Sequence, residues 1–419
     1  HNNSAFGVGT MMENTTGAEN TAVGSNALQQ NTTASYNVAV GRLALAANTT
    51  GAYNIAVGGT ALDANTTANY NTAVGYGALS ENTTAGNNVA VGTNALLANT
   101  TGADNVAVGM ATLDANTTGA SNVAVGKSAL GANTTGTQNT AIGLEALLAN
   151  TTGQDNTGVG RRALDANTTG GFNIGVGGHA LSANTTADGN VAVGYSSLLV
   201  NTTGGSNTAV GTNAMDACTT GANNASIGHS ALGNVTTGDY NVGVGMSAAY
   251  DLTTGDNNIC IGHDSMTSSA TSSLEIVIGK TATGKGTRTF FVVADSGVYH
   301  GGNTTTWATT SDRRIKKNIV DNNSGLDALN SIQVKNFEYK TRDEIANDSP
   351  ELKDVVDSAV VEKEGVQLGV IAQELETILP ECVSTTSTGV KTVNADNLTW
   401  HLINAVKELS AKVTALEAK

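Results

Sequence analysis

The chain has 419 residues, with 50 Gly and only 2 Pro, and charged residues make up 13% of it, about half the share that a globular domain usually carries. The net charge of −15 argues against a basic surface for nucleic acid. We find no run of about 18 apolar residues, so we expect no membrane insertion. The three cysteines, Cys218, Cys260 and Cys382, are isolated and odd in number, and they offer neither a disulfide framework nor a paired zinc motif.

A five-residue block, Asn-Thr-Ala-Val-Gly at residues 20–24, returns every 17 residues. An early copy begins at Asn3, and a degenerate last copy spans residues 275–279. A second block, Asn-Thr-Thr, recurs in the same register from Asn14 to Asn201. Its Asn is then replaced in three units, at Cys218, Val235 and Leu252. About 17 copies of N-x-A-V-G-x-x-A-L-x-x-N-T-T-G-x-x follow without insertion or deletion, so each unit must add the same rise.

Each unit is predicted to contain two short strands and two turns. In the first strand, Thr21 and Val23 share one face and Ala22 takes the other. The second strand would carry Ala27 and Leu28, with Leu filling the interior. Stacked units would form Asn and Thr ladders at about 4.8 Å and a rod of roughly 80 Å. The fold class is therefore mainly β: a parallel β-solenoid, or β-roll, of 17-residue repeats.

A coil of 17 residues encloses few side chains, so the rod is expected to need partners. The column of small residues at Ala22 suggests that three chains pack through that face into a homotrimer. The pattern N-[V/T]-A-V-G-x-x-A-L resembles the repeat in the head domains of trimeric autotransporter adhesins, which are trimeric parallel β-rolls. The resemblance covers about residues 3–280, and the adhesin unit is shorter than the unit found here.

The composition changes after about residue 285. Residues 287–293 are predicted to form a strand. From Ser311 onward the chain holds both prolines, 13 of the 20 Lys and Arg and 18 of the 35 Asp and Glu, which indicates a separate domain of ordinary globular character. Three parts are expected: a solenoid stalk at 1–285, a β neck or linker at 286–310 and an α+β domain at 311–419.

Three blocks in the last part occur in a fixed order. They are S-D-R-R-I-K-K-N-I at residues 311–319, G-V-I-A-Q-E-L at 369–375 followed by L-P-E at 379–381, and L-T-W-H-L-I-N-A-V-K-E-L at 398–409. Together they resemble the C-terminal intramolecular chaperone of phage tail spikes and fibres, the endosialidase type, which is also a self-cleaving serine peptidase. The resemblance covers residues 311–419.

This resemblance implies a Ser–Lys dyad, with Ser311 as nucleophile, Lys316 as general base and Thr310–Ser311 as the scissile bond. A Ser hydroxyl is a weak nucleophile that needs an adjacent base, and a lysine acts as one only when unprotonated. Like charges favour that form, and Arg313, Arg314 and Lys317 would supply them. Without the other blocks, the same basic run would indicate only a solvated face. The expected activity acts on the chain itself, with no external substrate.

The end of the chain carries an apolar stripe with the alternating four- and three-residue spacing of a coiled coil, formed by Leu402, Val406, Leu409, Val413 and Leu416. The stripe either aligns three chains or packs on its own domain. A register slip of one coil costs little in a uniform repeat, so a trimer needs an element that sets its register. Cleavage after assembly would then discard that element and leave a kinetically stable product.

We therefore expect a homotrimeric fibre, as in a phage tail fibre or spike within the virion, that contacts a host cell-surface glycan or protein receptor. The alternative is a bacterial cell-surface or secreted trimeric adhesin with the same chaperone. A free-standing enzyme acting on polysaccharide is poorly supported, because no paired carboxylates recur. We expect no cofactor, no structural metal and no nucleic acid. Aromatic residues precede the strand Asn at scattered places and either stack on sugars or decorate the surface: Tyr36, Tyr53, Tyr70, Phe172 and Tyr240.

Overall fold

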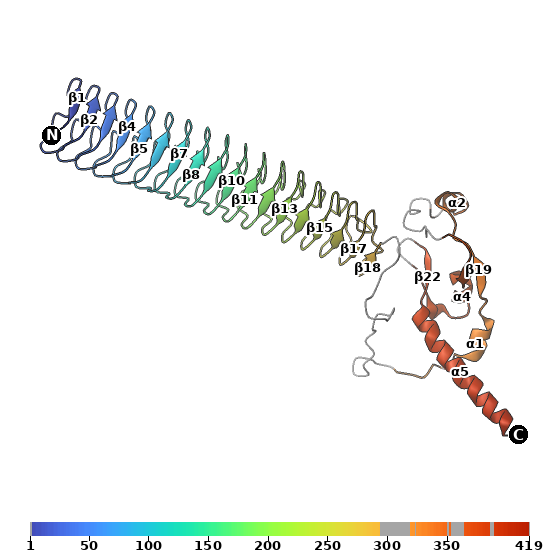
Figure 1. Cartoon of the computed structure of the whole chain (residues 1–419). Helices are drawn as coiled ribbons and strands as arrows, with labels where there is room; N and C mark the ends of the chain where they lie inside the picture. The colour runs from blue at the N-terminus through green and yellow to red at the C-terminus, as the bar shows by residue number, and fades with distance from the viewer. Residues whose placement is uncertain are drawn as a thin grey trace. The chain divides into compact units, whose positions relative to one another are not determined.

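The computed structural model of the chain describes residues 2–293, 319–322, 324–349, 352, 364–385 and 389–418. The chain divides into two compact units, His1–Val293 and Ala294–Lys419. The first is a regular stack of coils, and the second mixes helices with short strands (Figure 1). Residues 294–318, most of the expected neck and the start of the expected C-terminal domain, lie outside the described residues, so the predicted boundaries stay predictions.

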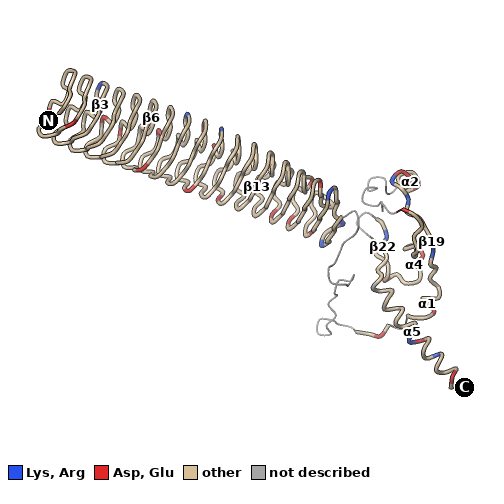
Figure 2. The backbone as a smooth tube through the Cα atoms, in the orientation of Figure 1, with Lys and Arg blue, Asp and Glu red and all other residues tan. Residues whose placement is uncertain are grey.

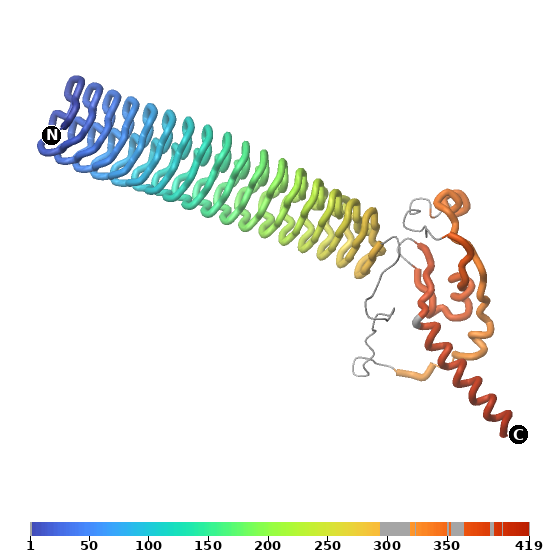
Figure 3. The backbone as a smooth tube through the Cα atoms, in the orientation of Figure 1, coloured from blue at the N-terminus to red at the C-terminus, as the bar shows by residue number. Residues whose placement is uncertain are grey.

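The first unit is a parallel β-solenoid with one short strand in each coil, and its backbone repeats coil after coil (Figure 3). The strands are β1 (Ser4–Phe6), β2 (Thr21–Val23), β3 (Val38–Val40), β4 (Ile55–Val57), β5 (Thr72–Val74), β6 (Val89–Val91), β7 (Val106–Val108), β8 (Val123–Val125), β9 (Thr140–Ile142), β10 (Thr157–Val159), β11 (Ile174–Val176), β12 (Val191–Val193), β13 (Thr208–Val210), β14 (Ala225–Ile227), β15 (Val242–Val244), β16 (Ile259–Ile261), β17 (Ile276–Ile278) and β18 (Phe290–Val292). Consecutive strands pair residue for residue at a step of 17, as Ala22 does with Ala39, until β18 follows at a shorter step. The predicted parallel β-solenoid is confirmed.

The predicted second strand is wrong, because residues 25–30 and their equivalents form turns. Leu28 has a φ of 51°, a left-handed conformation that a bulky side chain rarely adopts. Its backbone N–H nevertheless donates to the carbonyl of Ala44 in the next coil at 3.0 Å. Full burial of the Leu side chain, worth about 1.5–3 kcal/mol, offsets the strained backbone.

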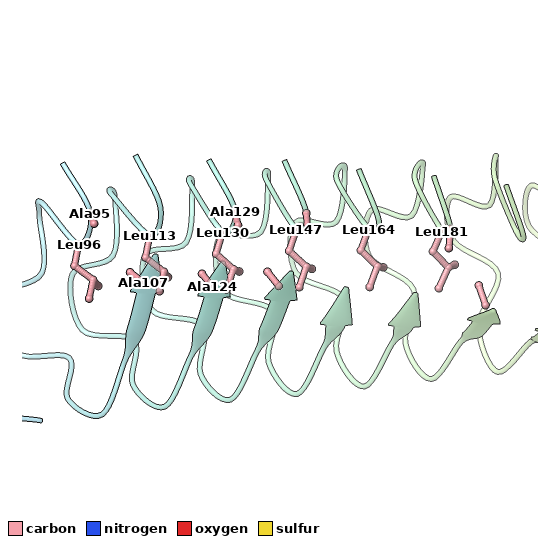
Figure 4. Close-up of a cluster of buried hydrophobic side chains, with 14 of the residues drawn as sticks. Ala95, Leu96, Ala107, Leu113, Ala124, Ala129, Leu130, Leu147, Leu164 and Leu181 are labelled. Atoms are coloured by element: carbon pink, nitrogen blue, oxygen red, sulfur yellow. The ribbon is translucent and has the colours of Figure 1, made fainter. Parts of the chain in front are cut away.

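The core of the solenoid is a column of Leu flanked by Ala, as Figure 4 shows for Leu113, Leu130 and Leu147. Leu28, Ala27 and Ala22 are all fully buried, so the prediction that Leu fills the interior is confirmed. The prediction that the Ala22 face meets neighbouring chains is wrong. Ala22 packs inside its own coil, because the thin coil favours small side chains opposite Leu, and Thr21 and Val23 point outward.

Two columns of buried Asn connect the coils. In the first, Asn20 accepts at Oδ1 from the backbone N–H of Asn37 at 2.9 Å, while Asn37 donates through Nδ2 to Gly51 O. In the second, Asn31 donates to Asn14 Oδ1 at 2.8 Å and to the carbonyl at the tip of its own turn. Such pairing removes the penalty of burying amides. The Asn side chains of the Asn-Thr-Thr turns from Asn31 to Asn201 are fully buried.

A tight corner follows each strand, at Gly24 and its equivalents. Gly24 has a φ of +133°, and a Cβ there would lie 2.5 Å from the carbonyl oxygen of Gly41. Only Gly fits this corner, since the stacked corners approach one another too closely for any side chain.

The second unit is a small α+β arrangement. Its elements are α1 (Leu326–Ser331), β19 (Lys335–Phe337), α2 (Arg342–Asp348), β20 (Gln367–Gly369), α4 (Ala372–Glu376), the 3₁₀ turn η3 (Pro380–Cys382), β21 (Val383–Thr385), β22 (Lys391–Val393) and α5 (Ala395–Glu417). The strands form two antiparallel pairs, β19 with β20 and β21 with β22. Leu375, Leu379 and Cys382 form a compact core under Leu398 of α5.

Candidate functional site

The predicted catalytic residues lie outside the described residues. This holds for the nucleophile Ser311, the base Lys316 and the scissile bond after Thr310. Their roles stay predictions from the resemblance, and the description of the second unit begins at Ile319.

The second of the three sequence blocks supplies the core of this unit. Gly369 ends β20, and a Cβ there would lie 3.1 Å from the ring of Phe337, so glycine lets the ring pack against the backbone. Leu375 and Leu379 point into the core, and Pro380 begins η3, a position where its missing N–H costs nothing. The block is therefore structural in the described residues.

The third block lies on α5 and fastens this helix to the segment before α1. His401 is 4% exposed, and its ring nitrogens lie 3.0 Å from Ser324 O and 3.0 Å from Glu381 Oε1. Asn404 donates to Asn322 O at 2.8 Å, and Glu408 accepts from the backbone N–H of Leu326 at 3.0 Å. Sequence reasoning missed these three anchors, although all of them lie in the block L-T-W-H-L-I-N-A-V-K-E-L.

A different face of α5 carries the predicted coiled-coil stripe, and that stripe is exposed. Its exposed fractions are 55% for Leu402, 58% for Val406, 51% for Leu409, 45% for Val413 and 70% for Leu416. The helix thus uses polar side chains to hold its own domain and leaves its regularly spaced apolar side chains without cover in the single chain.

The strand face of the solenoid is a second uncovered apolar surface. It consists of the first and third residues of β1 to β17, and none of them is charged. Several are markedly exposed for β-branched residues, including Ile55 at 41%, Ile142 at 41% and Ile227 at 48%. The acidic and basic residues of the solenoid lie on the segments between the strands (Figure 2).

The solenoid contains two thiols that the environment keeps protonated. Burial raises the pKa of Cys218 to about 12 and that of Cys260 to about 12. Cys218 stands in the second Asn column and Cys260 in the Ala22 column, so both act as small core residues. Among the described residues we find no group of three or more His, Cys, Asp or Glu placed to hold a metal ion. No helix in the described part of the chain is long and apolar enough to span a membrane.

The aromatic residues before the strand Asn are less scattered than their sequence positions indicate. Tyr36, Tyr53 and Tyr70 stack in successive coils, with ring centroids 5.0 Å and 5.2 Å apart and nearly parallel planes. Stacked in this way, the ring of Tyr53 presents its edge to solvent because its two neighbours cover its faces.

Comparison with known proteins gives a family match within the second unit. Residues 311–384 match the family model described as the chaperone of endosialidase. No curated protein and no solved structure matches the chain. The resemblance drawn from the sequence blocks is confirmed for residues 311–384, which hold the first two blocks and follow a parallel β-solenoid of 17-residue coils. The third block, at residues 398–409, lies beyond the matched residues.

Proposed function

We propose that the chain is one subunit of a homotrimeric fibre, and that its C-terminal domain directs the assembly and then cuts itself off before Ser311. The observation that carries this proposal is the match of residues 311–384 to the chaperone of endosialidase, a domain that implies association of the chain with itself. The exposed stripe on α5 supports it, because five regularly spaced apolar residues are uncovered in the single chain.

The strand face is the surface through which the three solenoids would meet. It is uncharged along its length, and its partly exposed β-branched residues would leave water on association, which contributes about 25 cal/mol per Å² of apolar area. Identical faces at an identical repeat match one another coil for coil. The same identity lets a chain slip by one coil at little cost, so the chaperone is needed to fix the register.

Cleavage would follow from the predicted dyad. The Oγ of Ser311 attacks the carbonyl carbon of Thr310 while Lys316 accepts the hydroxyl proton. The C–N bond breaks, the Ser311 nitrogen takes up a proton, and water hydrolyses the ester that results. The product is a fibre ending at Thr310 and a released domain, so assembly becomes irreversible.

The proposed biological role is that of a phage tail fibre or spike, carried on the virion, that contacts a receptor on the host surface. The family match and the rod support this role. The resemblance of the repeat to adhesin heads supports one further candidate, a cell-surface or secreted bacterial adhesin built on the same trimer.

Intact mass and light scattering test the proposal. The wild-type chain is expected to give fragments 1–310 and 311–419, whereas Ser311→Ala stays at 42.1 kDa and Lys316→Ala cleaves more slowly. Light scattering is expected to give the mass of a trimer both for the cleaved wild-type chain and for the uncleaved Ser311→Ala chain. Identical fragments from Ser311→Ala would reject the nucleophile, and a single chain mass would reject the trimer.

A further inference from the structure

One corner of each coil differs in composition from the rest of the solenoid. We call the two residues after the Gly of each N-x-A-V-G block, such as Ser25 and Asn26, the corner column. Every Lys, Arg and His between residues 2 and 281 lies in this column: Arg42, Lys127, Arg161, Arg162, His179, His229, His263 and Lys280. A regular scaffold that confines one class of charged residue to one edge is typical of a recognition surface.

The same three-residue constellation occurs twice in this column. Arg42, Gly59 and Tyr76 follow one another at steps of 17 residues, and so do Arg161, Gly178 and Tyr195. The second set follows the first after 119 residues, which is seven coils of 17. We call each set an Arg–Gly–Tyr site. Backbone hydrogen bonds stack its members directly, since Thr60 N–H donates to Arg42 O at 2.9 Å and Gly77 N–H donates to Gly59 O at 3.1 Å.

The Tyr ring of each site lies close to the Gly of the preceding coil. A Cβ at Gly59 would lie 3.4 Å and 3.7 Å from Cδ2 and Cε2 of Tyr76, and the same two distances separate a Cβ at Gly178 from Tyr195. The rings are 64% and 58% exposed. The Cδ2–Cε2 edge of each ring lies nearest the Gly of the preceding coil, and more than half of each Tyr stays open to solvent.

At the second site, the Arg contacts the coil that lies between it and the Tyr. Arg161 Nη2 lies 2.5 Å from His179 Nε2, and the His179 ring meets Tyr195 edge-on at 6.2 Å. Arg162 is held apart by Glu145 at 2.7 Å. A guanidinium carries five N–H donors, so the contact with His179 leaves most of them for a ligand. After each Tyr, the next coil adds the same polar pair, Thr93 with Asn94 and Thr212 with Asn213.

We propose that the two Arg–Gly–Tyr sites bind an acidic oligosaccharide that runs along the rod. The C–H face of a pyranose ring packs on the Tyr face, and the carboxylate or other acidic group of the glycan pairs with the Arg guanidinium. Two coils separate Arg from Tyr, about 9–10 Å at the spacing of parallel strands, which is the length of about two sugar rings. The proposal rests on the proposed function, in which the fibre contacts a host surface, and it names the chemistry of that contact.

The test uses the full chain on a printed array of acidic and neutral bacterial polysaccharides, followed by titration with uronic acid hexasaccharides. The double variants Tyr76→Ala with Tyr195→Ala, and Arg42→Ala with Arg161→Ala, are each expected to weaken binding about tenfold. Tyr76→Phe with Tyr195→Phe is expected to retain it. Gly59→Leu with Gly178→Leu is expected to abolish it while both rings remain, because the new side chain lifts the ring.

Matched controls lie in the same column. Met110→Ala removes an exposed apolar side chain and Lys127→Ala an exposed charge, neither of them in an Arg–Gly–Tyr site, and binding is expected to stay within about twofold. Melting curves verify that every variant folds. Equal binding by the Tyr variants, equal loss in the controls, equal binding of neutral glycans, or no acidic glycan bound would each overturn the proposal. If the chain is a trimer but binds no acidic glycan, only this inference is rejected. If the chain is a monomer, the proposed function is rejected.

Discussion

The two units of the chain solve the problem of stability in opposite ways. The solenoid repeats one solution, and a single hydrophobic core runs from Ala22 to Ala282 with amide columns beside it. The second unit gathers a few side chains around Leu375, Leu379 and Cys382 and fastens α5 by polar contacts. Repetition gives the solenoid strength along its axis but no information about alignment, because each coil meets the same surroundings as the next. The irregular unit has a much smaller buried core, and under the proposed function its unrepeated surface would supply the alignment.

The largest effect on assembly is expected from removing the irregular second unit. Deletion of residues 311–419 is expected to abolish correctly assembled soluble trimers, because nothing then fixes which coil of one chain meets which coil of another. Size-exclusion chromatography with light scattering measures the loss. Soluble trimers from the truncated chain would falsify the assembly role.

A more specific test of the assembly role changes only the apolar stripe of α5. Leu409→Ser with Val413→Ser is expected to lower the trimer yield strongly, whereas Trp400→Ser, at a residue that is 65% exposed and off the stripe, serves as the matched control. Equal yields from both variants would show that the stripe has no part in assembly.

Within the solenoid, the two Asn columns are expected to differ in tolerance. Asn122→Leu leaves the backbone N–H of Asn139 without its acceptor, and a buried orphaned donor costs about 1–3 kcal/mol. Asn133→Leu is milder, because Gly136 O still receives a bond from Asn122 Nδ2 at 3.0 Å and because Cys, Val and Leu already occupy this column in three coils. Thermal melting followed by circular dichroism compares the two, and an equal or larger drop for Asn133→Leu contradicts the reasoning.

The smallest expected effect concerns the buried thiols. Burial raises the pKa of Cys218 and Cys260 to about 12 from the ordinary thiol value of 9.0, so the unfolded chain loses these protons at a lower pH than the folded one. The contribution of the two protonated thiols to the free energy of unfolding is fully present below pH 9 and declines as the pH rises from 9 toward 12. Chemical denaturation across that range is expected to show a shallower decline for Cys218→Ala with Cys260→Ala. A decline of the same slope in the variant would mean that the thiols do not contribute.

The sequence predicts the solenoid well because an unbroken period of 17 leaves only a stack of equal coils. It does not predict which face of Thr21-Ala22-Val23 is interior, since alternation separates two faces without saying which is inside. The sequence also does not predict the left-handed conformation of Leu28, because bulky residues rarely adopt it and only the stacked coils stabilise it. In the second unit, the blocks predict the family match at residues 311–384. They do not predict that His401 and Glu408 are anchors, because their partners lie about 20 and 80 residues away. The Arg–Gly–Tyr sites are visible in the sequence as residues that recur at steps of 17 and again after 119 residues. They lie in a different column from the aromatic residues before the strand Asn.

The locked amide columns also bear on how long such a rod survives outside a cell. Asparagine ages by deamidation, which starts when the backbone nitrogen of the next residue attacks the side-chain carbonyl. In the first column that carbonyl is held by the backbone N–H of the coil above, and the surrounding core keeps water away. A chain unusually rich in a fragile residue thereby gains chemical durability from the way it folds.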